Sequence, residues 1–167
     1  RFMVTGDPSY ISSTIIGFVG DRSVIFENGE DPTSKLIGLN ILNAIPPYSS
    51  GWGTGGGILI DNSSPTITSC LFQNNTLTST SWPSYGEGGA ISIIGNSSST
   101  ISNCTFTNNY ASRGGGAINI IDADDVIVED CIFNNNYVSS GWAGGSVRIE
   151  SDATVRNCTF QNNSQAM

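Results

Sequence analysis

Three observations predict that this 167-residue chain is an all-β solenoid, a parallel β-helix of about six turns with three short strands per turn. Gly, Ser, Asn and Thr make up about 45% of the residues, and this mixture disfavours helices because glycine loses backbone entropy and short polar side chains compete for backbone hydrogen bonds. Two motifs recur in register along the chain. Within them, apolar residues alternate with a period of two, which is typical of strands with one buried face.

The first motif is Cys-x-Phe followed by asparagines. Its cysteines are spaced 34, 27 and 27 residues apart, and Leu39 takes the cysteine position in a degenerate earlier copy. If each copy stacks on the next, identical side chains form columns, and asparagines at the bend can bond to one another and to the bend's backbone. The expected columns are Cys70, Cys104, Cys131 and Cys158; Phe72, Phe106, Phe133 and Phe160; and Asn43, Asn74, Asn108, Asn135 and Asn162.

The second motif is a glycine pair followed by a strand, as in Gly88-Gly89-Ala90-Ile91. Alternation places Ile58/Ile60, Ile91/Ile93, Ile118/Ile120 and Val147/Ile149 inside the coil, and Leu59, Ser92, Asn119 and Arg148 outside. A third strand is expected around Ile67, Ile101, Ile127 and Val155. The connections are too short for crossover helices and lack the turn residues of repeated hairpins, so parallel coiling fits best.

The whole chain, 1–167, is expected to be one β-helix segment. Residues 1–33 read as irregular first turns, with weak strands at 13–18 and 23–26 and a polar turn at 27–33, and residues 34–167 read as the regular repeats. We expect the segment to belong to a longer protein, because a coil with open ends exposes unpaired strand edges. Neighbouring turns or domains of that protein would then be its first partners.

The glycine and phenylalanine motifs also carry a family resemblance. Gly88-Gly89-Ala90-Ile91 and Gly115-Gly116-Ala117-Ile118 alternate with Phe-x-x-Asn at Phe72, Phe106, Phe133 and Phe160, and this pairing resembles the repeats of polymorphic outer-membrane proteins, which are surface passengers with adhesin roles. Residues 15–41 resemble the broader pectate-lyase-like superfamily of right-handed β-helices. The resemblance implies a right-handed coil and no single activity, since lyases, hydrolases, adhesins and passive stalks share this architecture.

Charge and composition exclude several classes of function. The net charge of -8 leaves no basic patch for nucleic acid, and no apolar run approaches a membrane span of roughly 20 residues. The chain has no histidine, and neither outward row of the coil carries two adjacent acids, so candidates for acid–base catalysis are few. We expect no catalytic set and no cofactor.

The acidic residues gather near one turn, and two interpretations are open. Oxygen clusters can hold calcium, although this spacing matches no defined loop, and a solvated turn that keeps the coil soluble is favoured. The residues are Asp122, Asp124, Asp125, Glu129, Asp130, Glu150 and Asp152.

The four cysteines admit two states. An even number in a secreted chain suggests disulfides, here Cys70 with Cys104 and Cys131 with Cys158, whereas a column of identical side chains favours free, buried thiols. The second state is preferred. A metal site is not expected, since ligands spread over four turns cannot converge on one ion.

The variable loops after each asparagine pair carry the positive functional signal. All three tryptophans and four of the five tyrosines lie in or beside them, on one flank of the coil. Such rings suit stacking on sugars or burial in a protein partner, although they can also fold back on the coil. The candidate ligand-binding residues are Trp52, Trp82, Tyr85, Tyr110, Tyr137 and Trp142.

We therefore expect a non-catalytic segment of a surface or secreted protein, serving as a stalk, fibre component or adhesin with a glycan or cell-surface protein as partner. Extracellular location is inferred from the acidic, lysine-poor and hydroxyl-rich composition. The alternative is a fragment of a polysaccharide lyase or hydrolase. Ice binding is disfavoured because the outward threonines form no unbroken flat array.

Overall fold

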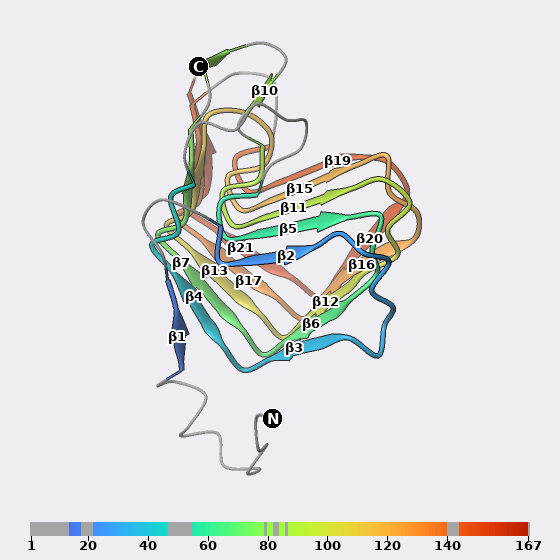
Figure 1. The fold of residues 1–167 in the computed structure, drawn as a ribbon. Helices are drawn as coiled ribbons and strands as arrows, with labels where there is room; N and C mark the ends of the chain where they lie inside the picture. The colour runs from blue at the N-terminus through green and yellow to red at the C-terminus, as the bar shows by residue number, and fades with distance from the viewer. Residues whose placement is uncertain are drawn as a thin grey trace.

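The computed structural model describes residues 14–17, 22–46, 55–78, 80–81, 84–85, 87–139 and 144–166. These residues form a parallel β-solenoid in which each turn of chain lies on the previous one, and three long sheets make the faces of a prism (Figure 1). The all-β parallel coil expected from the sequence is confirmed. The number of turns and of strands per turn differs from the expectation.

The described strands fall into four parallel sheets rather than three. The glycine-motif sheet contains β2 (Val24–Phe26), β5 (Ile58–Asp61), β11 (Ile91–Ile94), β15 (Ile118–Ile121) and β19 (Val147–Glu150). The middle sheet contains β3 (Lys35–Ile37), β6 (Thr66–Thr68), β12 (Thr100–Ser102), β16 (Val126–Glu129) and β20 (Ala153–Arg156).

The other two sheets follow in each turn. The cysteine sheet contains β1 (Ile15–Ile16), β4 (Asn40–Leu42), β7 (Leu71–Gln73), β13 (Thr105–Thr107), β17 (Ile132–Asn134) and β21 (Thr159–Gln161). The short sheet contains β8 (Thr76–Leu77), β14 (Tyr110–Ala111), β18 (Tyr137–Val138) and β22 (Ser164–Gln165). In the described residues, about four turns carry a strand in every sheet, preceded by the three-stranded turn β2–β4 and by β1.

One antiparallel pair interrupts this pattern. Strands β9 (Thr80–Ser81) and β10 (Ser84–Tyr85) pair with each other inside the connection between β8 and β11. The sequence predicts a plain loop for this connection, and it gives no sign of the pair.

Residues with a left-handed backbone form the corners of the coil. After each strand of the cysteine sheet from β4 to β21, the corner is an asparagine with φ near 55°, from Asn43 to Asn162. The corner after the middle sheet stacks Gly38, Ser69, Asn103, Asp130 and Asn157, all with positive φ. Because asparagine, aspartate and glycine tolerate this conformation better than other residues, the Asn and Gly excess is in part a consequence of the repeated corners.

The paired glycines serve close packing between turns. A Cβ atom on Gly89 would lie 2.2 Å from the Gly116 carbonyl oxygen of the next turn and 2.6 Å from that of Tyr110. Both contacts are with backbone, which cannot move aside without breaking the stack. Glycine at this position lets the chain enter the strand at the spacing of neighbouring turns.

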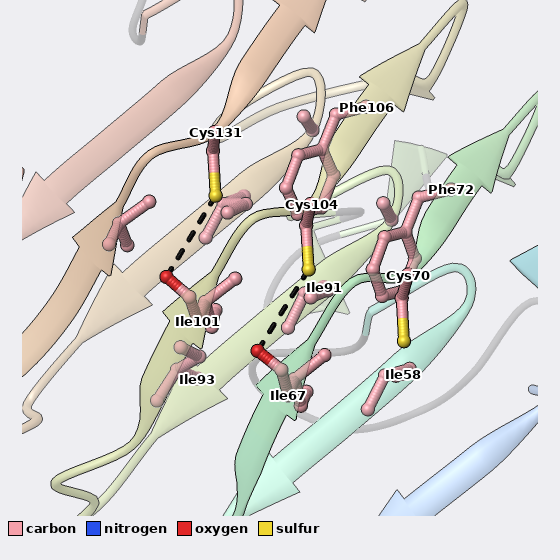
Figure 2. Close-up of a cluster of buried hydrophobic side chains, with 14 of the residues drawn as sticks. Ile58, Ile67, Cys70, Phe72, Ile91, Ile93, Ile101, Cys104, Phe106 and Cys131 are labelled. Atoms are coloured by element: carbon pink, nitrogen blue, oxygen red, sulfur yellow. Dashed lines mark hydrogen bonds between the residues drawn. The ribbon is translucent and has the colours of Figure 1, made fainter. Parts of the chain in front are cut away.

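The core is a narrow apolar column along the coil axis. Isoleucines of the glycine-motif sheet meet the cysteines and phenylalanines of the cysteine sheet (Figure 2). In the last turn of the column, Ile149 and Phe160 are 42% and 49% exposed. In the middle sheet, the residue of β16 that stands in register with Ile101 and faces the core is Val128. Ile127, which the sequence analysis grouped with Ile101, stands in register with Thr100 instead.

Candidate functional site

The phenylalanine column stacks ring on ring through four turns. Adjacent centroids are 4.7 to 4.8 Å apart with interplanar angles of 4 to 6°. The spacing follows that of the strands, because each ring rises from the same position one turn later. Phe72, Phe106 and Phe133 are fully buried, so this column is part of the scaffold and not a binding surface.

The cysteine column lies beside the phenylalanines. Cys70, Cys104 and Cys131 are buried, Cys158 is half-buried, and all four are free. Each sulfur lies within hydrogen-bond reach of two backbone carbonyls, one of its own turn and one of the preceding turn, between which its single hydrogen is shared. The Sγ of Cys131, for example, lies 3.1 Å from the Glu129 oxygen and 3.8 Å from the Ile101 oxygen (Figure 2). The thiols of Cys131 and Cys70, together with burial, raise the pKa of the Cys104 thiol above its ordinary value.

The interior amide ladder is one residue further along the chain than the sequence analysis placed it. Asn43, Asn74, Asn108, Asn135 and Asn162 form the exposed left-handed corners, and only Asn74 to Asn43 and Asn162 to Asn134 make side-chain contacts, at 3.3 Å. The residue after each corner points inward. The ladder consists of Asn75, Asn109, Asn136 and Asn163.

Each ladder amide satisfies several groups that would otherwise be unpaired. The Asn109 side-chain oxygen accepts from the Asn75 backbone at 3.1 Å and from the Asn75 amide at 3.0 Å. Its Nδ2 donates to the Phe72 carbonyl at 3.1 Å and to Asn136 Oδ1 at 2.9 Å. In Asn75, Asn109 and Asn136 the oxygen and both amide hydrogens are bonded, so the ladder holds the corner rather than offering a site to a ligand.

The outer face of the glycine-motif sheet carries a cluster of polar and charged side chains. Leu59, Ser92 and Asn119, which alternation places on the outside, are nonetheless buried. The glycine motif covers this row: a Cβ on Gly55 would lie 2.6 Å from the Ser92 backbone nitrogen, and one on Gly88 would lie 3.2 Å from the Asn119 Cβ. The row is therefore closed from solvent over these turns.

Glu87 joins this row from the preceding loop, and sequence reasoning missed it. Its Oε1 accepts from Arg148 Nη1 at 2.9 Å and its Oε2 from Asn119 Nδ2 at 3.2 Å. Arg148 also pairs with Glu150, through Nη2. The side chains of Arg148 and Glu87 are 18% and 13% exposed. The only signal in the sequence is that Glu87 precedes a glycine pair where the equivalent positions hold Thr54, Gly114 and Ala143.

This cluster fastens three consecutive turns together. Glu87 belongs to the turn of β11, Asn119 to β15 and Arg148 to β19. Both carboxylate oxygens of Glu87 are occupied by partners of the protein itself. We refer to Glu87, Asn119 and Arg148 as the polar clamp.

Of the six expected ligand-binding aromatics, the structure brings two together. Tyr110 and Tyr137 stand in register on β14 and β18, with ring centroids 5.7 Å apart and planes at 22°. For Tyr85 only the backbone, in β10, is described. Trp52, Trp82 and Trp142 lie outside the described residues, so their place on the flank stays a prediction.

The acidic residues lie mostly in solvent. Asp122, Asp124, Asp125 and Asp130 are exposed, and Glu129 pairs with Arg156 of the next turn, with Oε2 to Nε at 2.8 Å. Among the described residues no group of three or more acidic or cysteine side chains is placed to hold a metal ion. No described helix could cross a membrane.

Comparison with known proteins agrees with this geometry. The family model described as the right-handed beta helix region matches residues 14–167. The chain therefore belongs to the right-handed β-helix family, which confirms the handedness that the resemblance implied. A search of curated proteins found no match. A search of solved structures likewise found none.

Proposed function

We propose that the chain is a non-catalytic, extracellular β-helix segment that serves as a stalk, fibre component or adhesin of a surface or secreted protein. The observation that carries this proposal is the continuity of the stacked columns: phenylalanine rings, thiols and amides repeat in register from turn to turn. Each turn is held by the next through the same contacts, which suits a rigid spacer.

The polar clamp supports the same proposal. A general acid or base must have an oxygen or nitrogen within reach of the substrate, and both oxygens of Glu87 are bonded to Arg148 and Asn119. The clamp is better suited to fastening turns than to proton transfer. The adhesin role is further supported by the likeness of the glycine and phenylalanine motifs to surface-adhesin repeats.

A polysaccharide lyase or hydrolase is the second candidate. The observation that favours it is the gathering of Glu87, Arg148 and Glu150 on one outer face, beside the loop that holds β9 and β10. An enzyme acting on a polymer needs charged groups of this kind on a surface that the polymer can reach.

One assay distinguishes the two candidates. The purified chain is incubated with neutral and uronic-acid polysaccharides, and unsaturated products and new reducing ends are measured over a day. We expect none above the buffer control. Polysaccharide cleavage that is lost in Glu87→Gln and kept in Glu129→Gln would show that the chain is an enzyme and would contradict the stalk function.

Location is tested separately. Surface biotinylation of intact source cells, followed by capture and detection of the chain, should label the protein. Labelling that requires lysis of the cells would contradict an extracellular role.

A further inference from the structure

The part of the coil formed by the cysteine sheet and the short sheet carries no charge. Four segments of eight residues build it over the four regular turns, and in a chain of net charge -8 none of them contains an acidic or basic residue. We call the outward side chains of these segments the neutral flank. The segments are 71–78, 105–112, 132–139 and 159–166.

Amides and hydroxyls dominate the neutral flank. The exposed corner asparagines, Asn74, Asn108, Asn135 and Asn162, form a column on it, repeated at the strand spacing of about 4.8 Å. Each amide has two donors and an acceptor, although one donor of Asn74 and one of Asn162 already bond to a neighbouring asparagine. The flank therefore presents regularly spaced groups that can both donate and accept, without a charge to attract ions.

The tyrosine pair stands beside this amide column. Tyr110 and Tyr137 follow their corner asparagines by two residues, and the Tyr110 hydroxyl donates to Ser139 Oγ at 2.9 Å. Ser139 Oγ in turn donates to the Ser112 carbonyl at 3.3 Å. The Tyr110 ring is thus held in place before any ligand arrives, which reduces the entropy lost on binding.

The last ring of the pair has a small neighbour in the next turn. Tyr137 is 37% exposed, and Ser164, which is exposed, stands in register with it on β22. A serine side chain is too short to stack over a phenol ring. Part of the ring therefore faces solvent, and the exposed corner residues Asn135 and Asn162 lie two positions before Tyr137 and Ser164 in the same two turns.

The charge distribution identifies the class of ligand. A polyanion such as a uronic-acid polymer needs cations, and the neutral flank has none. A basic protein would be drawn to the exposed acids Asp122, Asp124 and Asp125, which lie at the corner between the glycine-motif and middle sheets. A neutral sugar chain has an apolar ring face for a tyrosine and hydroxyls for amides.

We propose that the neutral flank is a binding site for a neutral polysaccharide, whose sugar rings stack on Tyr137 while its hydroxyls bond to the corner amides of Asn135 and Asn162. This inference rests on the proposed adhesin function and deepens it. It places the ligand site on the cysteine sheet and the short sheet, with Tyr137 and Asn135 supplied by one turn and Asn162 by the next. It also makes the ligand neutral.

Affinity electrophoresis of the full chain tests the proposal. Native gels contain glucan, mannan or xylan as neutral probes, polygalacturonate as the acidic probe, or no polymer. At least one neutral probe is expected to retard the wild-type chain, and Tyr137→Ala is expected to weaken its Kd about tenfold, as removal of an aromatic platform does. Asn135→Gly should weaken it severalfold while keeping the left-handed corner.

Asn157→Gly is the matched control. Asn157 is also an exposed corner asparagine, with φ of 53° against 54° for Asn135, but it lies at the corner between the middle and cysteine sheets. This variant should bind like the wild type. Far-UV circular dichroism establishes that each variant is folded, and Asn135→Gly carries the test if Tyr137→Ala is not.

Three outcomes would overturn the proposal. The first is no retardation of the wild type by any neutral probe, and the second is equal binding by wild type, Tyr137→Ala and Asn135→Gly. The third is concentration-dependent self-association that Tyr137→Ala abolishes, which would assign the flank to a second copy. Failure here without polysaccharide turnover leaves the stalk function standing, whereas turnover contradicts the stalk itself.

Discussion

Removing one amide from the middle of the ladder should destabilise the coil far more than removing its neighbour at the corner. Asn109→Ala leaves the Asn75 backbone N–H and one Asn75 amide hydrogen without their partners and removes one donor from the Phe72 carbonyl. Asn75 and Asn109 are fully buried, and each orphaned buried group costs about 1–3 kcal/mol. We expect a loss of about 4 kcal/mol, which is a large fraction of the stability of a typical domain.

Urea unfolding followed by far-UV circular dichroism measures this loss, with the slope of the transition checked against the wild type because repeat proteins can depart from two-state behaviour. The matched variant is Asn108→Gly, which removes an exposed amide and keeps the positive φ of 55°. It should change stability by less than about 0.5 kcal/mol. Equal losses for the two variants, or a larger loss for Asn108→Gly, would refute the placement of the ladder.

Three further predictions concern other parts of the coil. Gly89→Ala should lower the free energy of unfolding by more than about 3 kcal/mol, because the new Cβ would meet two backbone oxygens. Gly29→Ala, where the Cβ meets open space and the only strain is a positive φ of 73°, should lower it by about 1 kcal/mol in the same urea assay. The raised pKa of Cys104 means that, above about pH 8.5, the unfolded chain releases a proton that the folded chain keeps. The lowered pKa values of Cys70 and Cys131 add no slope there, because both thiols are ionised in either state. The Cys104 contribution to stability should therefore fall above about pH 8.5, by up to about 1.4 kcal/mol per pH unit, and Cys104→Ala should remove this part of the slope. If Cys104→Ala leaves the pH dependence of stability unchanged, the pKa of Cys104 is not raised in the folded chain. Glu87→Gln should lower the thermal midpoint by several degrees, because its partner Arg148 is mostly buried. Glu129→Gln should lower the free energy of unfolding by less than about 1 kcal/mol, because its partner Arg156 is 58% exposed. A larger loss of stability for Glu129→Gln than for Glu87→Gln would contradict the polar clamp.

Much of the fold follows from the repeat, because a column in a solenoid is simply one residue type recurring at the period. The alignment of Cys70, Cys104, Cys131 and Cys158 places Leu39 in the same column, and the strand register agrees. The polar turn before β3 and the weak strands β1 and β2 could be recognised by the same alignment.

The position of the amide ladder could not be derived from alternation. Cys70, Phe72 and Asn74 are two residues apart, so strand alternation places all three on the buried face. The positive φ of 57° at Asn74 turns the chain and shifts the alternation by one residue, which brings Asn75 inside. Two adjacent asparagines look alike in the sequence, and only the backbone conformation at the corner tells them apart.

The fourth strand and the polar clamp escaped sequence reasoning for different reasons. Strands of two residues, such as Tyr110–Ala111, are too short to show a period. Glu87 and Arg148 are 61 residues apart, and their contact depends on how a loop folds over two further turns. Neither distance nor partner is encoded in a local pattern.

The central claim is that each turn adds one strand spacing in register, and a distance along one column tests it most directly. Ile37 and Arg156 lie in a single outward column of the middle sheet, separated by four strand pairings. Spin labels on the double variant Ile37→Cys, Arg156→Cys are measured by pulsed electron resonance, with the four native cysteines, including the half-buried Cys158, shown beforehand not to react in the folded wild type. The stacked coil predicts a narrow distribution centred at about 19 Å, four strand spacings. A broad distribution, or one centred above about 30 Å, would contradict the in-register stack.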